Sequence, residues 1–158
     1  MNGSGHFRNW IWDPWLLISQ ILAMQSIFYG SVGFWFMIYS TLTSTPLSLE
    51  PIFNYDGLYL QDYDGKRVFV AFVLNALTSA IGLWLVVGRA KLCLDFATTV
   101  HCWHLVIVWM YNHSFPVSLS WWLLNVICIT LTTVLGEYLC MRSEMRAIPV
   151  SLGPKAEV

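Results

Sequence analysis

Four long apolar blocks occupy most of this 158-residue chain and leave almost no sequence for a water-soluble domain. A bilayer core about 30 Å thick is spanned by roughly 20 helical residues, which rise about 1.5 Å each. All four blocks meet that length, and they cover residues 15–42, 68–87, 92–111 and 117–141. The sequence therefore predicts an all-α, polytopic membrane protein, a single four-transmembrane-helix bundle over residues 1–158.

Composition argues against the soluble alternatives. Hydrophobic residues make up 57% of the chain and charged residues only 11%, against about 25% charged residues in ordinary globular domains. A soluble helical bundle would show a polar face on each helix, and these blocks do not. No basic stripe is present to neutralise phosphates, so nucleic acid is not expected as a partner, and the lipid bilayer is.

The distribution of Lys and Arg predicts that both termini are cytosolic. Cytosolic segments carry an excess of these residues. One side of the four-span arrangement has only Lys66 and Arg67. The other side has Arg8, Arg89, Lys91, Arg142, Arg146 and Lys155. The loop over 43–67 is therefore predicted to face the lumen or exterior. It contains two turn signals, Asp56-Gly57 and Asp64-Gly65, and the Tyr and Leu residues around the first indicate a small hairpin.

The cysteines and the one sequon between spans are predicted to have no chemical function. The four cysteines lie in or at the edges of the blocks without a Cys-x-x-Cys motif, so they are expected to be small buried packing residues. Reversible palmitoylation of Cys93 or Cys140, at the membrane edge, stays open as an alternative. Asn112-His113-Ser114 is a glycosylation sequon, but it lies so close to the bilayer that no glycan is expected.

Two acidic residues lie inside the predicted spans near the cytosolic boundary. Asp95 and Glu137 are about 5–6 Å from it, at about 1.5 Å per residue. A charge at mid-bilayer costs at least about 2.5–3.5 kcal/mol on insertion, but at this depth both side chains can reach the interface. Arg89, Lys91 and Arg142 are close enough in sequence to pair with them. Two interpretations stay open: an interfacial collar of ion pairs, or a docking site for a cytosolic partner.

Two deeper histidines do not form a convincing metal site. At about 100° per residue, Asp95 is about 120° from His101 and about 180° from His104 around the helix. One metal ion cannot easily use all three side chains. Bis-histidine haem needs ligands on facing helices, and no other block contains histidine. The sequence therefore predicts no metal, no cofactor and no catalytic site.

A structural role suits the uncharged polar residues of the blocks better. Asn75, His104 and Asn125 fall at similar depths, about 10–12 Å from the lumenal side, and Gln25 lies near mid-bilayer. Such groups avoid lipid and form hydrogen bonds between helices, worth about 0.6 kcal/mol each. We therefore predict a structural polar layer formed by Gln25, Asn75, His104 and Asn125.

Several short motifs occur in a fixed order along the chain. They include Trp12-Asp13-Pro14, Asn75-Ala76-Leu77-Thr78, Cys93-Leu94-Asp95-Phe96, Thr99-Val100-His101, Trp121-Trp122-Leu123 and the stretch Gly136–Arg142. In this order and spacing the chain resembles the SYS family of Golgi integral membrane proteins. The resemblance covers the chain from Trp12 to near its C-terminus.

The resemblance implies a function that periodicity alone does not show. Proteins of this family are receptors in the trans-Golgi membrane for an Arf-related small GTPase with an acetylated N-terminus, they support protein trafficking, and they are not enzymes. Contact residues do not follow from the resemblance. On depth and charge, the candidates for partner binding are Asp95, Glu137, Arg89, Lys91 and Arg142.

Two further interpretations stay open. The rival function is a small transporter or membrane-embedded enzyme that uses the ionisable groups Asp95, His101, His104 and Glu137. Association of the chain into homo-oligomers is also compatible with the sequence.

Overall fold

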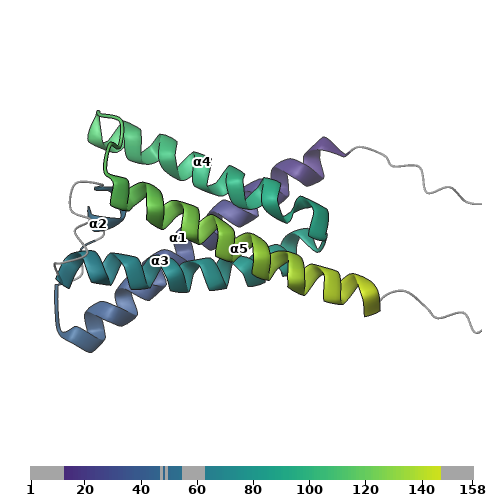
Figure 1. Cartoon of the computed structure of the whole chain (residues 1–158), viewed down its shortest axis with the longest axis horizontal. Coiled ribbons are helices and arrows are strands. Elements are labelled where there is room, and N and C mark those ends of the chain that lie inside the picture. Colours follow the sequence, from purple (N-terminus) through teal and green to yellow (C-terminus); the bar gives the residue numbers. More distant parts are fainter. Residues whose placement is uncertain (1–12, 47, 49, 55–62, 147–158) are drawn as a thin grey trace, which may run out of the picture.

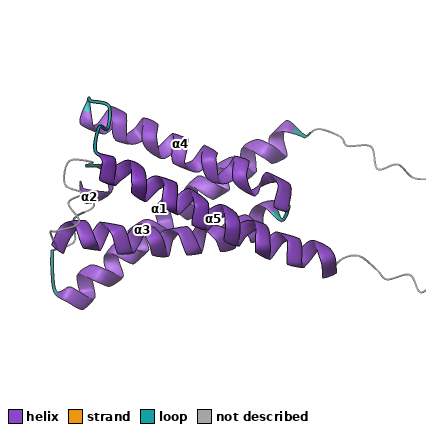
Figure 2. Ribbon diagram, viewed as in Figure 1, coloured by secondary structure: helices purple, strands orange, loops and turns teal. Residues whose placement is uncertain are grey.

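The computed structural model describes residues 13–46, 48, 50–54 and 63–146, which form helices joined by short connections (Figures 1 and 2). None of these residues lies in a strand. The long helices are α1 (Pro14–Thr43), α3 (Tyr63–Gly82), α4 (Cys93–Asn112) and α5 (Leu119–Arg146). The short elements are helix α2 (Glu50–Phe53), the π-helical turn η1 (Leu83–Val87) and the 3-10 turn η2 (Ala90–Leu92).

The predicted membrane bundle is confirmed. Four helical segments are long and apolar enough to cross a membrane, and they cover Pro14–Thr43, Gly65–Val87, Ala90–Asn112 and Leu119–Arg146. Each coincides with one of the four apolar blocks. Asp13 precedes α1, and Pro14 occupies its first turn, where the missing proline N–H costs no intrahelical hydrogen bond.

The region predicted as a loop over 43–67 differs from expectation in two respects. Asp64-Gly65, interpreted as a turn, lies in the first turn of α3, which begins at Tyr63. The turn prediction at Asp64-Gly65 is therefore wrong, because a helix start tolerates the same Asp and Gly residues that favour turns. The other turn signal, Asp56-Gly57, lies outside the described residues. The short helix α2 was not predicted.

The helices pack as a bundle in which α3 and α5 are central. α1 packs mainly on α3 and crosses the other helices obliquely, while α5 packs on both α3 and α4 (Figure 1). The N-terminal end of α1, the C-terminal end of α5 and the connection from α3 to α4 lie at one end of the bundle (Figure 1). Helix α2 and the connection from α4 to α5 lie at the other (Figure 1).

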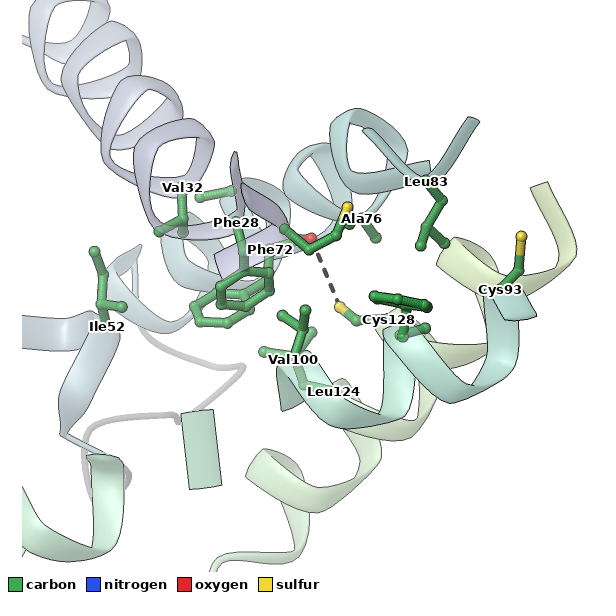
Figure 3. Close-up of a cluster of buried hydrophobic side chains, with 14 of the residues drawn as sticks. Phe28, Val32, Ile52, Phe72, Ala76, Leu83, Cys93, Val100, Leu124 and Cys128 are labelled. Carbon is green, nitrogen blue, oxygen red and sulfur yellow. Dashed lines mark hydrogen bonds between the residues drawn. The ribbon is translucent and has the colours of Figure 1, made fainter. Parts of the chain in front are cut away.

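Each long helix buries one stripe and exposes an apolar outer face. In α1 the buried side chains recur at every fourth position, as Met24, Phe28, Val32, Phe36 and Ser40. Figure 3 shows Phe28 gathered with Phe72, Val100 and Leu124 in the core, where the Cys128 thiol donates to the Phe72 carbonyl oxygen at 3.6 Å. The outer faces carry large exposed apolar side chains such as Leu22 and Val126. Such faces suit lipid.

At the α2 end of the bundle, the Asn112 side chain joins α4 to the backbone of α2. Its side-chain nitrogen donates to the Phe53 carbonyl at 2.6 Å and to the Val108 carbonyl at 2.8 Å. Ile52 is buried, and the Phe53 ring stacks on Tyr29 with centroids 6.3 Å apart. These bonds occupy the nitrogen that a glycan would modify in the sequon.

The predicted topology has a direct test. With tags at each terminus and within residues 55–62, protease added to sealed Golgi vesicles is expected to digest both terminal tags and to spare the internal tag until detergent is added. The reason is the excess of Lys and Arg in the terminal segments and the α3–α4 connection. Protection of either terminal tag would contradict the model with both termini in the cytosol.

Candidate functional site

The connection between α3 and α4, residues 83–93, is a compact turn that we call the knuckle. Helix α3 ends in the π-helical turn η1, and the chain reverses at Gly88, whose φ of 62° is readily adopted only by glycine. The Gly88 N–H donates to the Leu83 carbonyl at 3.0 Å. The candidate residues Arg89 and Lys91 are exposed on the knuckle, on either side of half-buried Ala90.

Helices α1 and α5 hold the knuckle in place. Gln20 of α1 donates its side-chain N–H to the Val86 carbonyl at 3.0 Å. Glu144 of α5 accepts a hydrogen bond from the Ala90 backbone N–H at 3.3 Å. The backbone of the knuckle is thus tied to the two helices that lead to the chain termini, so Arg89 and Lys91 project from a fixed support.

Helix α5 packs tightly against the knuckle at Gly136. A Cβ atom at Gly136 would stand 2.9 Å from Leu83 Cδ1 and 3.6 Å from Cys93 Sγ. The Sγ atoms of Cys93 and Cys140 lie 3.7 Å apart, and both residues are fully buried. Burial removes these thiols from an acylating enzyme, which needs an accessible thiolate. The packing role predicted for these two cysteines therefore suits the structure better than palmitoylation. Cys128 is buried as well, but the prediction of burial is wrong for Cys102, which is exposed on the outer face of α4.

Asp95 lies in the first turn of α4, on the face opposite to the buried stripe. Among the described residues its carboxylate makes no hydrogen bond or ion pair. The carboxylate lines a groove of about 530 Å³ on the outer face of α4. The groove, called the α4 groove below, is lined by Leu94, Asp95, Thr98, Thr99, Cys102, Trp103 and Val106.

Glu137 and Arg142 are both exposed on α5 at the knuckle end. Glu137 is not one of the described residues that line the α4 groove. The structure therefore places Asp95 and Glu137 at the same end of the bundle, as their depth indicates, but only Asp95 in the groove.

Three of the four residues predicted for the polar layer are buried and form hydrogen bonds between helices. Asn75 Oδ1 accepts a hydrogen bond from Ser31 Oγ, which joins α3 to α1. The other two bonds join His104 Nδ1 to the Tyr29 hydroxyl at 3.3 Å and His101 Nδ1 to Asn125 Oδ1 at 3.0 Å. Gln25 differs, because within the described part of the chain its buried amide atoms have no hydrogen-bond partner.

His104 is enclosed by aromatic rings from three other helices. Its ring centroid lies 5.6 Å from those of Phe28 and Phe72, 6.1 Å from Tyr29 and 6.2 Å from Trp121, on which it stacks. The imidazole is fully buried and fills the core as a flat side chain that also holds one hydrogen bond. Its surroundings are those of a packing residue.

Sequence reasoning did not identify the bonding partners Tyr29, Ser31 and His101. A hydroxyl can bond to the carbonyl of its own helix, as Ser31 also does, so its presence in a span is a weak signal. His101 was considered as a metal ligand and as an ionisable group of the rival transporter or enzyme, but not as part of the polar layer. In the part of the chain that the structure describes, no three His, Cys, Asp or Glu side chains come together where a metal ion could bind.

The comparisons with known proteins all match the same family. Residues 7–150 match the sequence profile of a family described as SYS1, "Integral membrane protein S linking to the trans Golgi network". The chain is 48% identical to a protein named "Protein SYS1 homolog" from Nematostella vectensis over 147 residues, which is 93% of each chain. No solved structure matches it.

More distant relatives carry the same name. The chain is similar to "Protein SYS1 homolog" from Dictyostelium discoideum, with 37% identity over 90% of this chain and 61% of that protein. It is also similar to "Protein SYS1" from Saccharomyces cerevisiae, with 27% identity over 80% of this chain and 63% of that protein. The matches therefore include most of the bundle in each case.

Proposed function

Because the chain belongs to the SYS1 family of integral membrane proteins linked to the trans-Golgi network, we propose that it is a receptor in the trans-Golgi membrane. It recruits an Arf-related small GTPase with an acetylated N-terminus to the cytosolic face and so supports protein trafficking. Its role is to bind, and no catalytic step is assigned to it. The identity of the partner is supported by the family resemblance. The position of the site is supported by the exposed charged groups at the knuckle end.

The observation that carries this proposal is the exposure of charged groups around a fixed support. Asp95, Glu137, Arg89, Lys91 and Arg142 are all exposed at the knuckle end. The knuckle backbone, which carries Arg89 and Lys91, is held by Gln20 and Glu144. A docking surface of this kind combines apolar packing with a few polar groups in set positions.

The chemistry of an acetylated N-terminal helix suits this surface. Acetylation removes the charge of the terminal amine, which would otherwise have to be desolvated near the membrane. An amphipathic helix without that charge can insert its apolar face beside the ends of the bundle helices, while its polar groups meet the exposed charges.

A transporter or enzyme that uses the same ionisable groups is less well supported. His101 and His104 are buried and bonded to Asn125 and Tyr29. Asp95 and Glu137 are exposed on the outside of the bundle. The four groups therefore do not line a shared path or pocket among the described residues, whereas a transport pathway needs its polar groups to face one another.

The double variant Asp95→Asn and Glu137→Gln tests the proposed site. Both changes keep side-chain size and remove charge. We expect correct Golgi localisation and a fall of roughly tenfold in GTPase recruitment, as when about 1.4 kcal/mol of binding free energy is lost. Recruitment is measured as the amount of acetylated GTPase that floats with reconstituted vesicles. The matched control is Glu50→Gln, which removes a carboxylate at the α2 end and is expected to change nothing.

The outcomes separate the site from the function. Normal recruitment by a correctly localised double variant would remove Asp95 and Glu137 from the site. Normal GTPase recruitment to Golgi membranes from which the whole protein has been depleted would contradict the receptor function itself. Loss of solute flux in the double variant, with the GTPase still bound, would support the transporter instead.

A further inference from the structure

We infer that the α4 groove is the seat of the GTPase's N-terminal helix, an inference that rests on the receptor function proposed above. It assigns the contact to the membrane-facing side of one helix, beginning at Asp95. Glu137, Arg89 and Lys91 then lie outside the seat, and any contact they make is with the rest of the GTPase.

The lining of the groove distinguishes it from an ordinary lipid-facing surface. The exposed face of α1 presents large apolar side chains such as Trp15, Leu16 and Leu22. The α4 groove instead presents a carboxylate, two threonines and a cysteine between bulkier apolar residues. Lipid tails offer no partner to polar groups, so this lining favours a protein occupant over an acyl chain.

The charge of the groove specifies the end of the occupant that it receives. Thr99 satisfies its hydroxyl by donating to the Asp95 backbone carbonyl at 2.7 Å, so the Asp95 carboxylate is the acceptor left for a ligand. The first turn of any helix has N–H groups without partners and carries partial positive charge. An acetylated helix keeps these donors and lacks the ammonium group. Asp95 can therefore cap such a helix where it enters the interface.

The size and shape of the groove suit a helix face. It is open along the outer face of α4, and all of its lining residues come from that helix, so a second helix can lie along it. Thr98 and Cys102 are one helical turn apart, and small residues at this spacing allow two helices to approach closely. Trp103, which is 52% exposed, supplies an aromatic surface of the kind that often anchors an interface.

Site-specific photocrosslinking tests this assignment. Wild-type vesicles are first shown to recruit the acetylated GTPase. The variant Trp103→benzoylphenylalanine, which replaces one large aromatic side chain of the groove by another, is then irradiated with the GTPase bound, beside the control Trp109→benzoylphenylalanine. Trp109 is a similarly exposed tryptophan on α4, outside the α4 groove. The expected result is a crosslink to the first residues of the GTPase from position 103 and none from position 109.

A second pair of variants does not depend on the photoreactive residue. Thr98→Leu with Cys102→Leu fills the groove while keeping the helix apolar, so membrane insertion is preserved. It is expected to reduce recruitment at least tenfold, whereas Thr130→Leu leaves recruitment unchanged.

Several results would overturn the assignment while the receptor function stands. They are a crosslink from position 103 to lipid or to a second copy of this chain only, no crosslink from position 103 while the GTPase is bound, equal capture of the GTPase from both positions, and normal recruitment by the filled groove. If wild-type vesicles fail to recruit the GTPase at all, the receptor function fails, and the assignment of the groove fails with it.

Discussion

Truncation of His104 to alanine is expected to lower the free energy of unfolding by roughly 2–5 kcal/mol, the range for removal of a large buried side chain. The side chain is fully buried among four aromatic rings, which cannot all close onto the space it leaves. The change also leaves the Tyr29 hydroxyl without its partner on α4. Thermal unfolding in detergent micelles measures the effect.

Two further variants separate the causes of this loss. His104→Leu fills most of the space and removes only the hydrogen bond, so a loss of about 0.5–2 kcal/mol is expected. Met110→Ala, on an exposed position of the same helix, should change stability by less than about 0.5 kcal/mol. Equal losses for His104→Ala and Met110→Ala would show that the aromatic enclosure does not stabilise the bundle.

Replacement of Gly136 by valine is expected to destabilise the bundle by roughly 1–3 kcal/mol, the usual cost of overfilling a packed core. A Cβ atom alone would stand 2.9 Å from Leu83 Cδ1, and valine adds two more carbons. Leu83 is fully buried, so either its side chain has to turn among packed neighbours or the knuckle has to move away from α5. Thermal unfolding again measures the loss.

The matched control for this variant is Gly30→Val. A Cβ atom at Gly30 would meet nothing within 4 Å, so a much smaller change is expected there. Leu83→Ala placed in the Gly136→Val background should recover part of the loss, because two residues in contact do not contribute independently. If the two glycine variants lose the same stability, helix propensity and not the contact with Leu83 is responsible.

Much of the fold was predictable because the bilayer imposes length and polarity on each span. The four blocks became four helices, with ends that differ by a few residues. The failure at Asp64-Gly65 has a local cause. Aspartate and glycine favour both turns and helix ends, and hydropathy does not decide between them at a membrane boundary.

The sequence predicted how deep the candidate residues lie in the membrane, but not the direction in which their side chains face. Counting residues placed Asp95 and Glu137 near the same end of the bundle, and the structure places both there. Which way each side chain faces depends on the rotation of each helix against its neighbours, which hydropathy leaves open. For the same reason the depth of Asn75 and His104 was informative, while their bonds to Ser31 and Tyr29 were not foreseen.

The packing of α5 also has a consequence for biosynthesis. Asn125 supplies the partner of His101, and Cys140 closes over Cys93, so the last of the four spans completes contacts prepared by the earlier ones. Until α5 has been synthesised, the His101 imidazole on the third span lacks its hydrogen-bond partner in the membrane. A nascent chain halted before α5 would therefore present the kind of exposed intramembrane polarity by which quality control distinguishes an unfinished protein from a finished one.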